Sequence, residues 1–262
     1  NPVAAFEQLG EAIKTILTFP AGSTLVATKP AAAKYWWESL KKLDFEEEFS
    51  RYGGAFIGRD WLFHEIGEWM TRKEARLLLL TADAGVGKSM FSAQTTARLN
   101  VHGVHFCSRS NIDSCRPLSW IQSLVYQLAL QFPAYRTLLE KMQNPNFNEP
   151  AESMFRSLVT DPLRTCQADL QIDEPWIFVI DGLDEAFAIS GHEFIDVLTG
   201  AVERLPFWLR ILATSRPDDR IISRFKLDGV SQTHIDASGE RNIRDVTEFI
   251  QNRFQLSTYS NS

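Results

Sequence analysis

The sequence predicts an α/β fold in which helices cover both faces of a parallel sheet, so that the molecule has three layers. Two observations predict it. Short apolar runs alternate with amphipathic helical stretches along residues 51–262. Most of these runs are almost continuously apolar, as expected of parallel strands that are buried on both faces. The chain has 262 residues, 44% of them hydrophobic, which is enough for one large core.

The individual elements follow from the spacing of the apolar residues. A helix is expected to begin at about Lys88, directly after a glycine-bearing loop. His102 and His105 lack a third metal ligand at a suitable spacing, and we expect them in a loop or at the sheet edge. Five strands are expected at residues 76–82, 104–109, 176–181, 209–215 and 233–237, and further helices at residues 117–132, 192–205 and 241–256.

The first 50 residues are interpreted as an N-terminal helical segment with a linker. Apolar residues at helical spacings predict one helix over residues 3–19 and a second over residues 31–49, separated by a stretch rich in proline and glycine. The sequence "RYGG" at residues 51–54 interrupts the pattern. We therefore place a domain boundary there and assign residues 51–262 to the α/β domain.

Composition and charge restrict the partners of the chain. Lys and Arg total 27 against 33 Asp and Glu, giving a net charge of -6 without a dense basic stretch, which disfavours a nucleic-acid partner. No apolar run approaches the roughly 20 residues of a membrane span. Cys107, Cys115 and Cys166 have neither zinc nor redox spacing and predict reduced, partly buried thiols in the cytoplasm. Because the first residue is Asn1, we expect a piece of a longer protein.

The sequence "TADAGVGKSMF" at residues 81–91 carries the first candidate site. Gly85 and Gly87 can adopt backbone angles closed to other residues, which lets successive N–H groups curl around phosphate oxygens at a helix N-terminus. A helix end contributes only about 0.3–1 kcal/mol, so a polyanion also needs the full charge of Lys88. Ala82 replaces the usual first glycine and is interpreted as tolerated, because close approach to phosphate falls later in the loop. Phosphate binding is therefore assigned to Asp83, Ala84, Gly85, Val86, Gly87, Lys88, Ser89 and Met90.

A second motif makes a chance match of this loop less plausible. The sequence "WIFVIDGLDEA" is an apolar strand that ends in Asp181 and is followed by Asp184 and Glu185. Because the carboxyl ends of parallel strands meet at one edge of a sheet, Asp181 is expected near Ser89, and the two are assigned to Mg²⁺. Asp184 or Glu185 would orient or deprotonate an attacking water, although either could merely cap the next helix.

A third apolar strand ends in the polar sequence "TSRP". Its Arg216 is assigned to contact the terminal phosphate and thereby to distinguish a triphosphate from a diphosphate. The alternative is an ordinary surface arginine at the end of a strand.

Together, "FIGRDWL", "ADAGVGKS", "FVIDGLDEA" and "ILATSRP" resemble the NACHT-type members of the STAND group, the signal-transduction NTPases with numerous domains. The resemblance covers roughly residues 55–250. It implies a P-loop NTPase three-layer sandwich with five parallel strands in the order 2-3-1-4-5, preceded by a short helical segment. It also implies adenine contacts from Phe56, Ile57, Gly58 and Arg59, and a helix over residues 60–70 that places Leu62, Ile66 and Trp69 on the sheet.

The resemblance implies a slow, Mg²⁺-dependent ATPase that acts as a conformational switch in signalling or innate immunity. The expected ligands are ATP, ADP and Mg²⁺, and ATP is favoured over GTP because no guanine motif is present. Relatives carry upstream effector domains and continue into helical, winged-helix and sensor regions, and they self-associate through this domain. Two alternatives stay open: an ATPase motor that acts on nucleic acid or protein, and a scaffold that binds nucleotide without hydrolysing it.

Overall fold

A computed structural model describes residues 34–52 and 58–259 of the chain. Within this range the core is a sheet of five strands that pair in parallel, in the order β2-β3-β4-β1-β5. The α/β class, the parallel direction and the number of strands are as predicted. The strands are β1 (Leu77–Ala82), β2 (Val101–Phe106), β3 (Trp176–Asp181), β4 (Leu209–Ser215) and β5 (Val230–Ile235).

The predicted strand order 2-3-1-4-5 is wrong. The structure places β4 between β3 and β1, with Leu212 of β4 paired to Val179 on one side and to Leu78 on the other. Strand β1 therefore has β4 and β5 as its neighbours. The apolar pattern identifies which runs are strands, but it holds no information on which buried strand lies beside which. The sequence also predicted that the strand ending in Asp181 pairs directly with the strand before the phosphate loop. This is wrong for the same reason, because β4 lies between β3 and β1.

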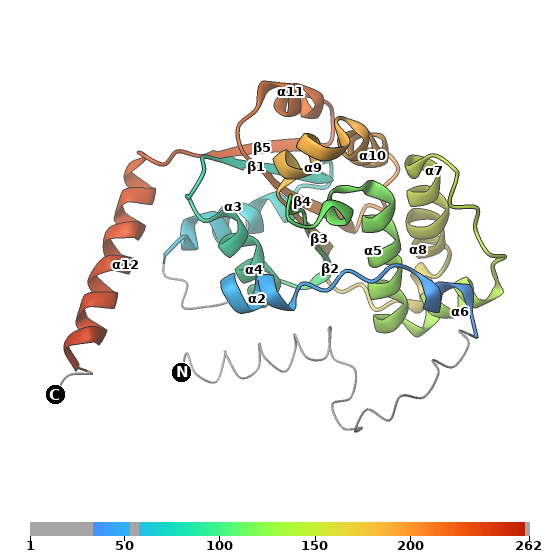
Figure 1. Cartoon of the computed structure of the whole chain (residues 1–262). Coiled ribbons are helices and arrows are strands. Elements are labelled where there is room, and N and C mark those ends of the chain that lie inside the picture. The colour runs from blue at the N-terminus through green and yellow to red at the C-terminus, as the bar shows by residue number, and fades with distance from the viewer. Residues whose placement is uncertain (1–33, 53–57, 260–262) are drawn as a thin grey trace.

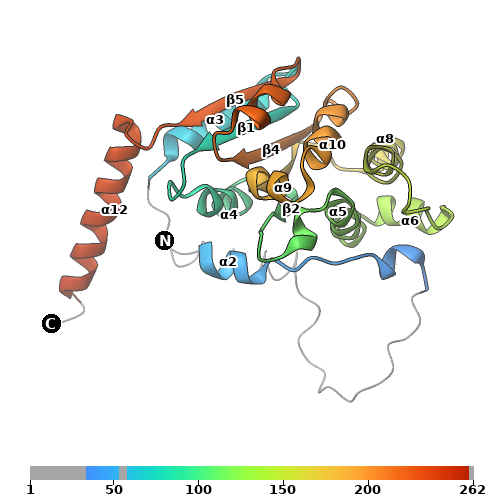
Figure 2. The same ribbon diagram turned by 45° about the horizontal axis from the view of Figure 1, so that its top comes forward.

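Helices cover both faces of the sheet (Figures 1 and 2). Alternate residues of β1 enter opposite cores: Leu77 and Leu79 one of them, and Leu78 and Leu80 the other. The first face carries η2 (Ile112–Cys115), α5 (Pro117–Gln131), α6 (Pro133–Lys141), α7 (Ala151–Phe155), η3 (Arg156–Thr160), α8 (Asp161–Thr165), α9 (Leu183–Ser190) and α10 (Glu193–Val202). The second face carries α2 (Glu46–Tyr52), α3 (Asp60–Thr71) and α4 (Lys88–Arg98).

The remaining elements are short or peripheral. They are η1 (Trp36–Ser39), η4 (Gln167–Asp169), α11 (Asp219–Ile222), η5 (Ser223–Phe225) and α12 (Glu240–Tyr259). In the part of the chain that the structure describes, no helix is both long and apolar enough to cross a membrane. Cys107, Cys115 and Cys166 are free and buried, in line with the predicted reduced thiols.

The helix predicted over residues 31–49 is corrected in its described part. Residues 36–39 form η1 and residues 46–52 form α2, with no helix between them. In this gap the N–H of Lys41 donates to the side-chain oxygen of Gln122 (3.1 Å), and the N–H of Leu43 donates to that of Ser123 (3.4 Å). Bonds to α5 thus replace the helical ladder. The helix predicted at residues 3–19 and the predicted adenine contacts Phe56 and Ile57 lie outside the described residues.

Residues 34–52 pack into the same two cores as the sheet. Phe45 and Phe49 of this segment are buried, and each ring lies 5.5 Å from that of Phe106 at the end of β2. Trp37 is buried in the other core. The domain boundary near residue 51 stays a prediction, although this segment shares its core with the α/β domain.

Strand β2 begins three residues earlier than predicted. Two histidines therefore belong to this buried strand. His102 and His105 lie within β2 and are buried. They are not in a loop, but β2 is an edge strand of the sheet, in line with the alternative that placed them at the sheet edge. The ring of His102 stacks on Trp176 of β3 with centroids 4.1 Å apart. Helix α5 covers this edge strand, because Gln127 bonds both the N–H and the carbonyl oxygen of Val104.

Candidate functional site

The loop after β1 leaves open space beside its glycines. Gly85 and Gly87 adopt left-handed backbone angles (φ 78° and 94°), and apart from the residues adjacent in the chain no described heavy atom lies within 4 Å of a Cβ built on either. Residues with a Cβ rarely adopt such angles, and the space that a side chain would fill is available to a ligand. Ala82 is the buried last residue of β1, as the sequence interpretation expects.

Lys88, the first residue of α4, folds back over this loop. Its Nζ donates to the carbonyl oxygens of Ala82 (2.6 Å) and Asp83 (2.9 Å). Burial lowers the pKa of Lys88, and the nearby carboxylates of Asp184 and Asp181 oppose this shift. A partly buried ammonium group gains from an anionic ligand, because an anion offsets the partial loss of solvation of its charge.

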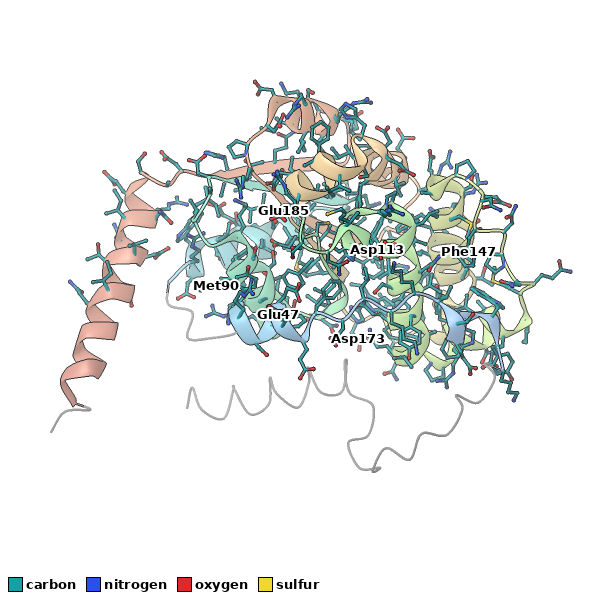
Figure 3. All side chains as sticks on the ribbon, in the orientation of Figure 1. Glu47, Met90, Asp113, Phe147, Asp173 and Glu185 are labelled. Carbon is teal, nitrogen blue, oxygen red and sulfur yellow. The ribbon has the colours of Figure 1, made fainter. Side chains whose placement is uncertain are left out.

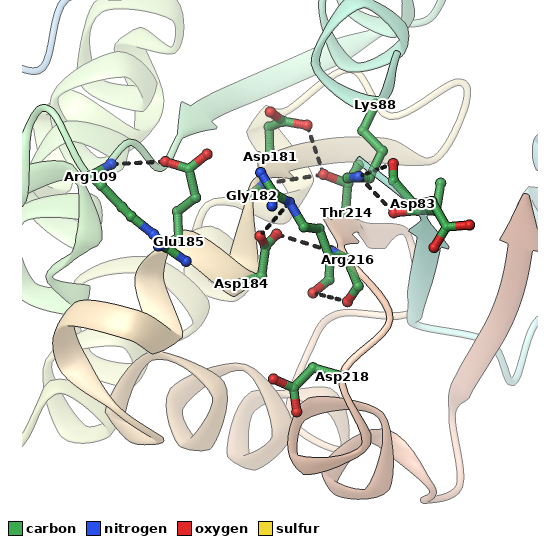
Figure 4. A network of polar contacts seen from close by, with 12 residues as sticks. Asp83, Lys88, Arg109, Asp181, Gly182, Asp184, Glu185, Thr214, Arg216 and Asp218 are labelled. Atoms are coloured by element: carbon green, nitrogen blue, oxygen red, sulfur yellow. Dashed lines mark hydrogen bonds and ion pairs between the residues drawn. The ribbon is translucent and has the colours of Figure 1, made fainter. Parts of the chain in front are cut away.

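Asp181, the last residue of β3, is buried and held by two hydroxyl groups. Its Oδ1 accepts hydrogen bonds from Ser92 Oγ and Thr214 Oγ1, both at 2.7 Å. Thr214 also accepts the N–H of Gly182 (3.1 Å), so β4 holds both the last residue of β3 and the turn that follows it (Figure 4). Sequence reasoning missed Ser92; its position three residues after Ser89 on one helix face was the available signal.

Asp184 and Glu185 lie in the first turn of α9 and are each oriented by a neighbouring loop. Asp184 accepts the N–H of Arg216 (3.0 Å) and lies 3.2 Å from the Nε of the same residue. Glu185 accepts the N–H of Arg109 (2.8 Å) from the loop after β2. Figure 4 shows both carboxylates beside Asp181 and Lys88 at the same end of the sheet. Arg216 is thus engaged by Asp184, and its guanidinium remains about half exposed.

These side chains surround one open cavity of about 350 Å³ at the carboxyl ends of the strands. A smaller neighbouring cavity of about 100 Å³ shares part of its lining, and α2 lines it in part with Glu47 (Figure 3). Tyr52 lines both cavities and was not predicted. The predicted residues brought together around the larger cavity are Ala84, Gly85, Gly87, Lys88, Ser89, Met90, Asp181, Asp184, Glu185 and Arg216.

Gly58 and Arg59 do not line this cavity. Arg59 is 6% exposed, adopts a left-handed φ of 64°, and donates from Nη2 to the carbonyl oxygen of Val86 and to Asn242 Oδ1. Its Nη1 is buried without a partner among the described residues. The predicted adenine contacts of Gly58 and Arg59 therefore stay predictions. Asp83 and Val86 take part through their backbone carbonyls, which accept from Lys88 and Arg59.

The arrangement fits a nucleoside phosphate with a divalent cation. The space beside Gly85 and Gly87 admits phosphate oxygens, and the partly buried Lys88 supplies positive charge. Ser89 and Asp181 line the same cavity and offer a hydroxyl and a carboxylate. The described residues hold no group of three His, Cys, Asp or Glu side chains that could bind a metal alone. Mg²⁺ usually takes one or two carboxylates and completes its shell with water and substrate phosphates, and Ser89 and Asp181 would supply such a partial ligand set.

Comparison with known proteins places the matched region over this site. The family model described as "Nephrocystin 3, N-terminal" matches residues 59–216, which span the phosphate loop, Asp181 and Arg216.

Two solved structures are similar at low identity. One is a signal transduction ATPase with numerous domains and a tetratricopeptide-repeat sensor from Pyrococcus horikoshii, with 16% identity and a TM-score of 0.37 over 78% of this chain and 25% of that one. The other is Drosophila ORC bound to GC-rich DNA and Cdc6, with 10% identity and a TM-score of 0.37 over 85% of this chain and 36% of that one. The chain thus spans about a quarter and about a third of those two proteins.

Proposed function

Because the chain belongs to the family described as Nephrocystin 3, N-terminal, whose matched region is NACHT-like, we propose that it is an ATP-controlled molecular switch. The observation that carries this proposal is the single cavity lined by Lys88, Ser89 and Asp181 at the carboxyl ends of the strands. Ligands of open parallel sheets lie at this edge. ATP and ADP are the expected ligands, and they would favour different arrangements of the domain against its neighbours in a longer protein.

Different residues of the chain would bind the phosphates and the Mg²⁺ ion. N–H groups of the loop at Gly85 and Gly87 and the charge of Lys88 would hold the phosphates. Ser89 and Asp181 would hold Mg²⁺, which when bound neutralises phosphate charge. Ser92 and Thr214 keep the Asp181 carboxylate in place.

Arg216 and the acidic residues in the first turn of α9 would act at the terminal phosphate. Asp184 or Glu185 would orient or deprotonate water, which makes the chain a slow ATPase that resets the switch. A terminal phosphate would compete with Asp184 for the half-exposed Arg216. This exchange is one source of the different affinities for ATP and ADP that a switch requires, about 5.5 kcal/mol for a shift from mostly closed to mostly open.

The wider setting of the switch belongs to the same proposal. We expect self-association through this domain in the full-length protein, joined to an upstream effector and a downstream sensor, in cytoplasmic signalling of the innate-immunity type. We expect no specific nucleic acid among its partners. Strong stimulation of ATP turnover by DNA, RNA or unfolded protein in a steady-state assay would instead favour a motor.

Nucleotide analysis of the purified chain tests the proposal. The protein is denatured and the released nucleotide identified, and the binding of fluorescent ADP is then measured with Mg²⁺ present. Lys88→Ala is expected to abolish binding because it removes the cation above the loop. Lys73→Ala is the matched control, since exposed Lys73 precedes β1 at the opposite edge of the sheet. Equal binding by wild type and both variants, or no binding by any of them, would overturn the proposal.

A further inference from the structure

Helix α12 contacts the rest of the molecule through polar side chains on its first two turns. Asn242 and Asp245 are three residues apart and so share one face. Oδ2 of Asp245 accepts the backbone N–H of Arg59 (3.0 Å) and the indole N–H of Trp61 (2.9 Å). Asn242 Oδ1 accepts from Arg59 Nη2 (2.9 Å). We call Arg59, Asn242 and Asp245 the α12 latch. Beyond it, α12 extends away from the α/β body in both views (Figures 1 and 2).

Arg59 links this latch to the phosphate loop. Its Nη2, which bonds Asn242, also donates to the carbonyl oxygen of Val86. In a trans peptide the C=O and the following N–H point in opposite directions. Holding the Val86 carbonyl toward Arg59 therefore turns the N–H of Gly87 to the other side, and Gly87 lines the cavity. One buried guanidinium thus spans the distance from α12 to the phosphate loop.

The turn that carries Arg59 depends on the same carboxylate. Gly58 and Arg59 both adopt left-handed φ angles, 84° and 64°, which is uncommon for a residue with a side chain. A Cβ on Gly58 would lie 2.7 Å from the Cβ and Cγ of Asp245. Asp245 is therefore seated directly against this turn and accepts its N–H, so the shape of the turn is tied to the docked position of α12.

Apolar burial does not hold α12 in place within the described residues. Ile243, Val246 and Ile250 are each about half exposed. Among the side chains that the structure describes, docking rests on a small number of polar contacts, which also include Arg241 with Glu65 at 2.9 Å. Because these contacts lie at the periphery of the sheet and bury none of the three apolar side chains named above, α12 can separate from the body without exposing the apolar core.

We propose that the α12 latch couples the docking of α12 to occupancy of the nucleotide site. Docked α12 holds Arg59, Arg59 holds the Val86 carbonyl, and the loop is thereby preorganised for phosphate. The ligand in this proposal rests on the proposed function, whereas the link between α12 and the loop is a property of the chain without ligand. Because coupling is reciprocal, nucleotide in turn stabilises the docked helix.

Amide hydrogen exchange with and without ADP and Mg²⁺ tests the coupling. In Asp245→Ala, exchange in residues 83–91 and 240–250 is expected to be faster than in wild type before any nucleotide is added. ADP is expected to slow exchange in residues 240–250 of wild type but not of the variant, whose affinity for ADP falls about fivefold or more. Glu248→Ala, which removes the same charge from an exposed position of α12, is the control and is expected to match wild type. Asn242→Ala is a second, smaller disruption should Asp245→Ala not fold.

The outcomes separate the two proposals. If wild type binds ADP, and both latch variants leave its affinity and the exchange of residues 83–91 unchanged, the latch is overturned and the proposed function stands. If wild type binds no ADP while Asp245→Ala still speeds exchange in residues 83–91, the proposed function fails and the link between α12 and the loop is supported.

Discussion

Asp181 shows how much of the site depends on neighbours that are themselves unreactive. Its carboxylate is 4% exposed, and two hydroxyl groups donate to one of its oxygens. Because hydrogen bonds to a charged group contribute about 1.5–3 kcal/mol each, the loss of one leaves a buried charge poorly compensated. Thr214 has a second role, since it also accepts the N–H of Gly182 at the turn into α9.

Thr214→Val should therefore weaken both the fold and the metal site. Valine keeps the shape but removes the hydroxyl group, and we expect the free energy of unfolding to fall by about 1.5–3 kcal/mol. We also expect the Mg²⁺ concentration needed for nucleotide binding to rise. Thr199→Val is the matched control, because the Thr199 hydroxyl only bonds carbonyls of its own helix. Denaturant unfolding and Mg²⁺ titration check both effects, and equal results for the two variants would contradict the role of Thr214.

Substitution of either carboxylate in the first turn of α9 is predicted to leave nucleotide binding nearly unchanged and to slow hydrolysis. Asp184→Asn or Glu185→Gln removes a candidate general base without changing size, so we expect nucleotide affinity to stay within a few-fold. Phosphate release should slow by about 100-fold or more for whichever residue acts on the water. Single-turnover hydrolysis of ATP measures this. If neither substitution slows release, the catalytic assignment is wrong and the non-hydrolysing scaffold is favoured.

At the scale of elements, the segment of residues 34–52 shows why a helical pattern can fail. Tyr35, Trp36, Leu40 and Leu43 have the spacing of one helix face, yet the chain between η1 and α2 is not helical. Side chains of α5 accept two of its N–H groups, and this tertiary pairing outweighs local propensity. Strands β3 and β4, by contrast, match their predicted bounds, because a short run of buried apolar residues leaves few alternatives.

We expect Phe45 to anchor α2 beside the two cavities at the carboxyl ends of the strands. Its ring is 1% exposed and packs on Phe106 and His105. Phe45→Ala should lower the free energy of unfolding by about 3–5 kcal/mol, the usual cost of a buried phenylalanine. Phe207→Ala is the control, because Phe207 is 65% exposed and should change stability by about 0.5 kcal/mol or less. A small loss for Phe45→Ala in denaturant unfolding would mean that residues 34–52 are dispensable to this core.

At the scale of the whole molecule, the sequence predicts which residues form the strands and the site better than it predicts which strands lie side by side. The motifs around Lys88, Asp181 and Arg216 predicted residues that the fold brings to one cavity. The order of the strands could not be predicted from the sequence, because the central strands are all similarly apolar. Which strands pair depends on the tertiary packing of the whole sheet. Contacts over nearly 190 residues, such as Asp245 with Arg59, leave no local signal at all. What could not be predicted is thus the set of long-range polar contacts that orient the site.

Strand β2 gives the whole molecule a predicted sensitivity to acid. Burial lowers the pKa of His102 from 6.5 to about 4, and that of His105 likewise to about 4. Between these values the unfolded chain binds a proton that the folded chain does not, so the free energy of unfolding falls as pH drops from 6.5 to 4. A shift of this size corresponds to about 3 kcal/mol for each histidine, since one pKa unit is worth about 1.4 kcal/mol.

Replacement of His102 isolates its share of this effect. His102→Phe keeps an aromatic ring in contact with Trp176 and Phe132 but cannot be protonated. We expect the wild type to lose about 3 kcal/mol more than the variant between pH 7 and pH 4, and the two curves to run parallel above pH 7 and below pH 4. Denaturant unfolding at a series of pH values measures this, and His64→Phe, at an exposed site of α3, controls for the loss of a histidine as such. Carboxylate titration is common to all three proteins. A difference between wild type and His102→Phe that did not change with pH would therefore show that His102 has the same pKa in the folded and unfolded chains, against the burial argument.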